Sequence, residues 1–229
     1  PDGRYMASLR NQDQVVFLNE SGLVANWTLG AEDDYDVLNE QHNPDYIPAD
    51  EGGPAVVVAD SLNDRLVEYQ RRDGEWVQTW AYSDAEMLWP RDADRLPNGH
   101  TLVSDSNGNR VLELDRQGDV VWSIPFYSSY EAERLGTGDE STGGPSAVAA
   151  NLTSNTETVG EPGVYKRAAG ALLPRKTVSG IAFVIPMWAG FGELLAAIVA
   201  AIALLAWTGV ELRRSSLSVE LDWPIRIER

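Results

Sequence analysis

The 229-residue chain contains no cysteine, only two lysines (Lys166 and Lys176) and only two histidines (His42 and His100). The absence of cysteine excludes disulfide bonds and thiolate metal sites, and it leaves the redox compartment undetermined. The scarcity of lysine belongs to a larger imbalance, because 35 Asp and Glu residues outweigh 18 Lys and Arg residues and give a formal charge of −17. A phosphate backbone needs a basic face, so nucleic acid is not expected as a partner.

The acidic, lysine-poor composition has two interpretations. It resembles the surfaces of proteins from salt-loving archaea, where dense carboxylates keep a protein hydrated and soluble in concentrated salt. The alternative is an ordinary acidic surface with no halophilic origin.

Three stretches of the chain align with one another and define an internal repeat, offset by about 51 and then about 45 residues, which is in the range of radial repeats. Each copy has a turn, an apolar run, a short polar stretch, a second apolar run, a glycine turn and a strand carrying tryptophan. Units of four short strands with glycine turns and periodic aromatic residues are typical of β-propeller blades. The copies span residues 2–29, 52–82 and 98–124, with glycine turns at Gly22, Gly74 and Gly118 and tryptophans at Trp27, Trp80 and Trp122.

The predicted fold class is mainly β, a partial β-propeller of two to three antiparallel four-stranded blades, followed by a linker and a C-terminal transmembrane α-helix. Residues 1–125 carry the blades, and residues 126–179 are rich in Gly, Ser, Thr, Glu and Pro, which predicts a flexible acidic linker. A closed propeller typically needs about four to eight blades. We therefore expect an incomplete propeller, either a fragment, which we favour, or blades that close with other copies.

The predicted transmembrane segment covers residues 180–212 and precedes a short tail at 213–229. Its centre, Leu194 to Val210, carries no charged residue. Seventeen helical residues span roughly 25 Å, and extension upstream to Trp188 supplies the rest of a roughly 30 Å hydrocarbon core. Trp188 and Trp207 then fall at the two interfaces. The alternative is a buried helix of a soluble domain.

The predicted orientation places the blades outside the cell and the C-terminus in the cytoplasm. Arg213 and Arg214 follow the apolar segment directly, which favours a cytoplasmic tail. The opposing signal is a basic cluster upstream at residues 166–176. Sequons for N-glycosylation lie on the predicted outer side at Asn19, Asn26 and Asn151, and whether they are glycosylated stays open.

The two histidines have different surroundings. His42 lies in the segment that leads into the second blade, Asn39 to Tyr46, and such segments run near the central channel, where propellers usually bind ligands. An imidazole there can act as a nucleophile or as a general acid or base. The alternative is a hydrogen-bonded loop histidine. His100 follows the Pro97-Asn98-Gly99 turn and is expected to be structural.

A second unusual feature is an arginine at the inner end of the first blade. Leu9-Arg10-Asn11 stands where the other copies have Asp60-Ser61 and Asp105-Ser106. A guanidinium group presents a planar fork of donors to sulfate, phosphate or carboxylate, so Arg10 predicts anion recognition. The alternative is a salt bridge to one of the many nearby carboxylates, such as Asp33 or Asp34.

Asp60 and Asp105 recur with Asn63 and Asn109, and we interpret them as residues that fix the blade turns. A calcium site at these residues is the less favoured interpretation.

The stretch from Asp94 to Asp115, DRLPNGHTLVSDSNGNRVLELD, resembles the blade motif of the arylsulfotransferase-like β-propeller family, particularly its membrane-anchored haloarchaeal members. The stretch from Pro1 to Asn11, PDGRYMASLRN, is similar to the blade of that family that carries a substrate-binding arginine. The resemblance covers about residues 1–135 and corresponds to the C-terminal part of the family's propeller.

The resemblance implies a six-bladed enzyme that moves a sulfuryl group from an aryl sulfate to a phenol through a transient sulfohistidine, without a nucleotide donor, cofactor or metal. His42 would be the nucleophile and Arg10 would hold the sulfuryl oxygens, with a hydrogen bond from Asn11 or Asn43. The family's site also uses histidines from other blades, so the active site is expected to be incomplete in this chain. The alternative function is a non-catalytic, membrane-anchored propeller that binds a ligand or partner protein at the cell surface.

Overall fold

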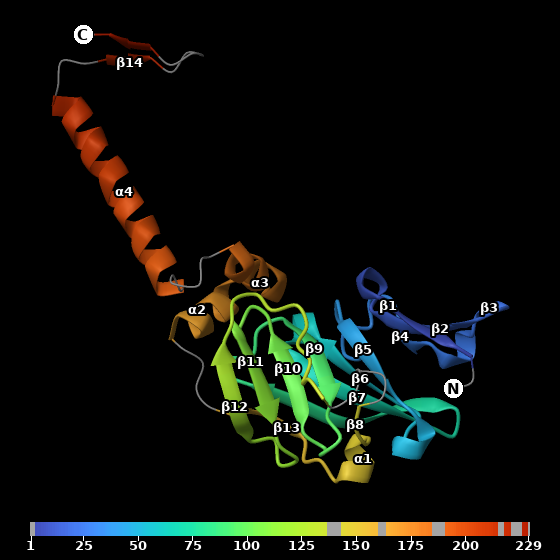
Figure 1. Cartoon of the computed structure of the whole chain (residues 1–229). Coiled ribbons are helices and arrows are strands. Elements are labelled where there is room, and N and C mark those ends of the chain that lie inside the picture. The colour runs from blue at the N-terminus through green and yellow to red at the C-terminus, as the bar shows by residue number, and fades with distance from the viewer. Residues whose placement is uncertain are drawn as a thin grey trace. The chain divides into compact units, whose positions relative to one another are not determined.

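The computed structural model describes residues 3–136, 143–159, 164–184, 191–214, 218–220 and 226–228. The chain forms two units, Pro1–Val184 and Ile185–Arg229. The first unit contains three antiparallel meanders of short strands (Figure 1). We refer to them as the first, second and third sheets in chain order.

The first sheet is formed by β1 (Tyr5–Leu9), β2 (Gln14–Asn19), β3 (Gly22–Leu23) and β4 (Leu29–Gly30), with β2 paired to the other three strands. Strand β1 pairs with β2 in a register that runs from Tyr5 opposite Leu18 to Leu9 opposite Gln14. Within the described residues β1 is an edge strand, because no strand pairs with its other side.

The second and third sheets each contain a complete four-stranded meander. In the second sheet the strands are β5 (His42–Ile47), β6 (Ala55–Asp60), β7 (Arg65–Arg72) and β8 (Glu75–Asp84). In the third sheet they are β9 (Pro90–Arg95), β10 (Thr101–Asp105), β11 (Arg110–Leu114) and β12 (Val120–Pro125). Strands β6 and β10 therefore correspond to β1, and β5 and β9 have no counterpart in the first sheet.

The sheets pack face to face through two apolar cores. One core joins the first and second sheets and includes Val15, Phe17, Val56 and Val67. The other joins the second and third sheets and includes Val57, Leu66, Trp80, Val103 and Leu112. Alternate residues of β6 enter opposite cores, as the period of two in a strand requires. Successive antiparallel sheets packed in this way confirm the predicted mainly β fold with blade-like sheets.

Two details of the repeat differ from the prediction. The segments that lead into the second and third sheets are themselves the first strands, β5 and β9, so His42 begins a strand rather than preceding one. In the first sheet Trp27 lies in a 3₁₀ turn, η2 (Ala25–Trp27), and not on a strand like Trp80 and Trp122. Its ring packs edge-on against Phe17 at 5.3 Å between centroids, so the apolar core places it without strand pairing.

The loops that follow β1, β6 and β10 have the same conformation. Asp13, Asp64 and Asn109 each adopt a left-handed φ between the paired strands. Two of these loops form 3₁₀ turns, η1 (Arg10–Gln12) and η4 (Ser61–Asn63). A third turn of this kind, η3 (Ala49–Glu51), joins β5 to β6. Strand register therefore makes Arg10, Ser61 and Ser106 equivalent positions.

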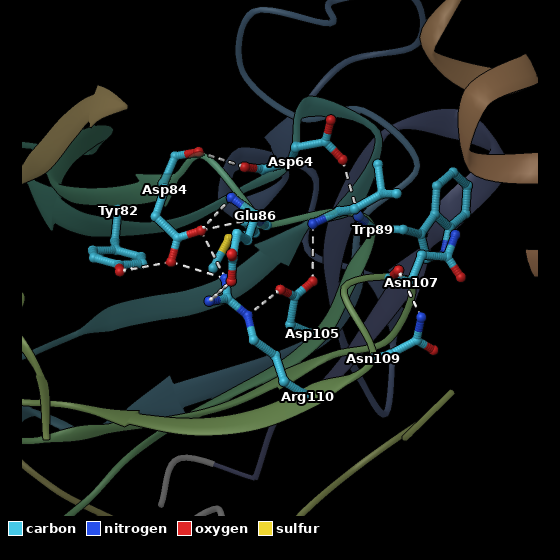
Figure 2. A network of polar contacts seen from close by, with 12 residues as sticks. Asp64, Tyr82, Asp84, Glu86, Trp89, Asp105, Asn107, Asn109 and Arg110 are labelled. Carbon is cyan, nitrogen blue, oxygen red and sulfur yellow. Dashed lines mark hydrogen bonds and ion pairs between the residues drawn. The ribbon is translucent and has the colours of Figure 1, made fainter. Parts of the chain in front are cut away.

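In the second and third sheets, a buried carboxylate at the end of β6 or β10 binds the segment that leads into the same sheet; Figure 2 shows this contact for Asp105. Asp105 accepts a hydrogen bond from Leu88 N at 2.9 Å and pairs with Arg110 Nε at 2.8 Å, while Arg110 also contacts Asp84 at 2.7 Å. Asp60 repeats the arrangement with Asn39 N and Arg65. Asp60 and Asp105 thus position the start of the preceding strand of their own sheet, β5 or β9, as well as their own turns.

The segments around Glu40, Trp89 and Ser128 are equivalent, because each of these residues adopts a left-handed φ just after a preceding sheet. We call residues 39–43, 88–92 and 127–131 the first, second and third lead-in segments. The third is followed by Ala-Glu-Arg-Leu just as the second is followed by Ala-Asp-Arg-Leu. The start of the predicted linker therefore continues the repeat.

Other parts of residues 126–179 also differ from a linker. Helix α1 (Ala147–Ala150) buries Ala147 and Ala150, and the backbone N–H of Ala147 donates to both oxygens of Glu68 at 2.9 Å. Strand β13 (Asn155–Val159) pairs in parallel with β8. The small residues of this segment allow α1 and β13 to pack closely on the second sheet. A segment rich in small and polar residues resembles a disordered linker when it is judged by composition alone.

Helices α2 (Val164–Leu172) and α3 (Arg175–Val184) complete the first unit. Val178 and Ser179 of α3 are buried, and Asn107 donates to the carbonyl of Ser179 at 3.0 Å. Residues 180–184, predicted to belong to the membrane segment, are instead part of this docked helix.

The second unit contains α4 (Phe191–Arg214) and a small hairpin of β14 (Ser218–Glu220) and β15 (Arg226–Glu228). Within the described residues, Gly192–Arg214 is the one stretch long and apolar enough to cross a membrane. Trp188, expected to lie at the membrane interface, is outside the described residues.

Candidate functional site

The first residue of β5, His42, is largely buried, with 8% of its surface exposed. Its Nδ1 lies 2.8 Å from Ser61 Oγ. The Ser61 hydroxyl also reaches the carbonyl oxygens of Pro90 at 2.6 Å and Ala59 at 3.4 Å, and both of these can only accept. The hydroxyl proton therefore goes to a carbonyl, and Nδ1 must donate to Ser61. In the neutral ring this leaves Nε2 unprotonated, with its lone pair available.

The surroundings of His42 favour the neutral ring. Burial lowers the pKa of His42 from 6.5 to about 4, and the nearby positive charges of Arg10 and Arg91 act in the same direction. The backbone carbonyl and the carboxylate of Glu40 oppose this shift. At neutral pH the imidazole is therefore an uncharged nucleophile or base.

Arg10 lies in η1, close to the first lead-in segment. Its Nη2 forms an ion pair with Glu40, and its Nη1 donates to Asn11 Oδ1 at 3.1 Å. Its Nε is buried without a hydrogen-bond partner. The alternative interpretation, a salt bridge to a nearby carboxylate, is therefore confirmed for Arg10, with Glu40 as the partner in place of the examples Asp33 and Asp34.

Arg91 is a second cation that the sequence analysis missed. It occupies the position in the second lead-in segment that His42 occupies in the first, and Tyr130 occupies it in the third. Its guanidinium carbon lies 5.0 Å from the centroid of the Tyr130 ring, and its Nε is also buried without a hydrogen-bond partner. Burial lowers the pKa of Arg91, and Arg10 adds to this effect as a like charge. Alignment of the lead-in segments would have identified it.

A cavity of about 290 Å³ lies between these residues and α3. Arg10, Arg91 and Trp89 line it from the blades, and Lys176 and Phe183 line it from α3. Lys176 Nζ is 2.5 Å from Glu40 Oε1, so Glu40 is paired with two cations. His42 is not among the lining residues, and its ring lies 5.9 Å from the ring of the lining residue Trp89, measured between centroids.

Asn11 and Asn43, which were predicted to bind the substrate, form hydrogen bonds with other side chains of the protein. Asn11 accepts from Arg10 and lines a neighbouring acidic cavity of about 520 Å³. Asn43 has a left-handed φ of 38° and hydrogen-bonds to Asp92, where it opposes the effect of burial, which raises the pKa of Asp92 to about 6. The structure therefore brings His42 and Arg10 into one region, whereas Asn11 and Asn43 support neighbouring side chains.

His100 is placed as a structural residue. Its Nδ1 lies 2.7 Å from Glu113 Oε1, and Arg134 binds the same carboxylate at 2.9 Å. Over the described ranges, no three or more His, Asp or Glu side chains are grouped as metal ligands.

No protein-family model and no curated protein matches the chain. Solved structures similar to it include virginiamycin B lyase from Staphylococcus aureus, with 15% identity and a TM-score of 0.39 over 57% of this chain and 41% of that one. A 6-phosphogluconolactonase candidate from Bacteroides uniformis has 12% identity and a TM-score of 0.40 over 56% and 39%. A protein from Lactobacillus plantarum has 14% identity and a TM-score of 0.39 over 53% and 39%.

The chain therefore spans about two fifths of the length of these structures. Sequence identities of 12–15% and TM-scores of 0.39–0.40 carry no argument about the function of this chain. The blade architecture is established by the three sheets themselves.

Proposed function

We propose that the first unit is part of an aryl-sulfate sulfotransferase-like propeller that moves a sulfuryl group between phenolic compounds through His42. The observation that carries the proposal is a neutral, buried imidazole close to two guanidinium groups whose buried Nε atoms have no hydrogen-bond partner. An unpartnered buried donor loses hydrogen-bonding energy, which an anionic oxygen would restore. Sulfate esters supply such oxygens.

The proposed chemistry follows from the tautomer of His42. Nε2 attacks the sulfur of an aryl sulfate, an N–S bond forms, and the S–O bond to the aryl group breaks with release of a phenolate. Ser61 accepts from Nδ1–H and so holds the ring as positive charge develops. A phenol then attacks the sulfur, the N–S bond breaks, and His42 returns to its neutral form. The acceptor phenol gives its proton to water, and the phenolate released in the first step takes one up from water.

Arg10 and Arg91 have the same role in this proposal, which is to bind the sulfuryl group. Both would donate to the non-bridging sulfuryl oxygens, where a planar guanidinium fork is well matched to a tetrahedral anion. Trp89 and Phe183 supply aromatic walls in the same cavity. Because His42 does not line this cavity, this mechanism requires the side chains next to it, such as Trp89, to move when the ester binds.

The location of the site at a membrane is a further part of the proposal. Helix α4 would anchor the chain in a bilayer by a single pass, with the blades outside and the C-terminus in the cytoplasm. Asn19, Asn26 and Asn151 are all exposed on the first unit, as acceptors for external glycosylation must be. Protease added to intact cells is expected to digest the blades and leave the C-terminal tail protected.

The test of the chemistry is direct detection of the intermediate. The full chain in detergent is incubated with an aryl sulfate, and intact-protein mass spectrometry is used to look for one added sulfuryl group. We expect the adduct in the wild type and in His100→Ala, and its loss in His42→Ala. Absence of the adduct in all three proteins, with sulfate-ester binding retained, would instead support the non-catalytic ligand-binding propeller.

A further inference from the structure

Helix α3 closes one side of the cavity of about 290 Å³ at Arg10 and Arg91, which we call the α3 cavity. Lys176 and Phe183 line it from the helix, and the two arginines line it from the blades. The guanidinium carbon of Arg91 lies 5.9 Å from the centroid of the Phe183 ring. The helix therefore brings a third cation and an aromatic ring to the cavity that already contains two guanidinium groups.

Contacts with two of the blade segments hold α3 in this position (Figure 1). Asn107, in the loop after β10, donates to the carbonyl of the buried residue Ser179 at 3.0 Å. Lys176 Nζ lies 2.5 Å from Glu40 Oε1 in the first lead-in segment. Residues 162–192 contain four basic residues and no acidic one, whereas the whole chain has a formal charge of −17, so charge attraction favours this docking.

Lys176 keeps hydrogen-bond donors for a ligand. An ammonium group has three N–H donors. Within the described residues Glu40 is the one acceptor of Lys176, whose side chain is 73% exposed. Glu40 is also paired with Arg10, and among the described lining residues it is the one carboxylate facing three cations. The cavity therefore has an excess of positive charge that a single anionic group does not neutralise.

We propose that Lys176 determines specificity in the α3 cavity by binding a second anionic group of an aromatic ligand, whose first anionic group is held by Arg10 and Arg91. Trp89 and Phe183 would pack against the ring between the two groups. A volume of about 290 Å³ is at the lower end of ligand pockets, about 300–1,000 Å³, and suits a single ring. The preferred ligands are then single-ring aryl sulfates that also carry a carboxylate. This inference rests on the anion binding in the proposed function and not on sulfuryl transfer.

The test compares two ligands that differ in one charge. The first, 4-sulfooxybenzoate, carries a sulfate and a carboxylate, and the second, 4-sulfooxybenzamide, has a neutral amide of similar shape in place of the carboxylate. Both are titrated calorimetrically into the full-length chain in detergent, with His42→Ala present so that no sulfuryl group is transferred during the measurement. We expect the benzoate to bind about 3- to 10-fold more tightly, as one charge-assisted contact at a partly exposed site allows.

Variants of α3 assign this preference to one side chain. Lys176→Met should abolish the preference, and Lys176→Arg should keep it. The ratio of the two affinities is the readout, because a general loosening of α3 would weaken both ligands alike. The matched control is Arg175→Met, which removes a positive charge from the same helix at a residue that hydrogen-bonds to Asn63 and does not line the cavity. This control should keep the preference.

Three results would overturn the inference: equal binding of the two ligands when Lys176 is present, an unchanged preference in Lys176→Met, or no binding of either ligand. The result is independent of the search for a sulfuryl adduct. An adduct on His42 together with equal binding of the two ligands would retain the proposed function and remove this inference. A preference that depends on Lys176, without an adduct, would retain this inference and support the ligand-binding propeller.

Discussion

The Ser61 hydroxyl fixes the protonation of His42, because Oγ lies 2.8 Å from Nδ1 and is already committed as a donor to a backbone carbonyl. Ser106, at the equivalent position in the third sheet, donates to the carbonyl of Ser129. The same contact between a loop and the next lead-in segment thus occurs twice, and only in the second sheet does it also orient a histidine.

Replacement of Ser61 should separate this orienting role from a structural one. Ser61→Ala is expected to lower the free energy of unfolding by about 1–3 kcal/mol, because a buried carbonyl and Nδ1 lose their partner. It should also reduce sulfuryl transfer by about 10-fold or more at unchanged KM, because either tautomer becomes accessible. Ser106→Ala is the matched control and should lose stability but not activity. Equal activities of the two variants, measured by phenol release, would remove Ser61 from the mechanism.

Arg91 should contribute to the binding of anionic esters. Arg91→Gln is expected to weaken sulfate-ester binding by about 10-fold or more, which corresponds to about 1.4 kcal/mol. Arg71→Gln is the matched control, because Arg71 packs against Trp27 and Trp76 away from this cavity. Calorimetric titration with an aryl sulfate measures both. Unchanged affinity in Arg91→Gln would leave Arg10 as the one proposed anion ligand.

The depressed pKa of His42 predicts a specific pH dependence. Between pH 6.5 and about 4 the unfolded chain binds a proton at His42 that the folded chain does not bind. Stability should therefore fall as the pH falls through this window. Denaturant midpoints at several pH values should show a shallower decline in His42→Gln than in the wild type. Parallel curves for the two proteins would contradict the shift.

Arg110 should be essential for the stability of the blades. It faces Asp84 and the fully buried Asp105, and burial raises the pKa of Asp105 to about 6 (Figure 2). Arg110→Met leaves two carboxylates unpaired and should cost about 3–5 kcal/mol at pH 7.5. The loss should be smaller at pH 5, where Asp105 can accept a proton. Arg72→Met, at an exposed residue, should change the unfolding midpoint little at either pH.

A charge at the centre of α4 should impair membrane anchoring. Ile202→Arg places a guanidinium group near the middle of the apolar stretch, at a cost of about 2.5–3.5 kcal/mol for insertion. The variant should shift from the membrane to the soluble or aggregated fraction after cell lysis. Glu211→Arg, near the end of the helix, is the control and should remain membrane-bound. Wild-type protein recovered in the soluble fraction would argue against a span.

The repeat and the apolar segment were enough to predict the blades and the long helix, because periodicity reports directly which faces are buried. Trp27 was misassigned because its aromatic character suited a strand, whereas packing on Phe17 places it in a 3₁₀ turn. The docking of α1 and β13 depends on contacts far apart in the chain, such as that between Glu68 and Ala147, which local composition does not encode.

The candidate site was predicted less completely than the fold. His42 and Arg10 were found as unusual residues at repeated positions. Arg91 was not predicted, although it occupies the position in the second lead-in segment that His42 occupies in the first. The pairing of Arg10 with Glu40 and of Asn43 with Asp92 depends on left-handed residues that bend the lead-in segments, and spacing along the chain does not reveal it.

The central position of the second sheet has a consequence for local unfolding and amide hydrogen exchange. Every residue of β6 is buried, because cores lie on both sides of that strand, whereas all of β12 is exposed. Amide hydrogens of β6 should therefore exchange with solvent most slowly, and those of β12 among the fastest. His42 is hydrogen-bonded within the slow-exchanging region, so the imidazole would keep its orientation through fluctuations that transiently detach the outer strands.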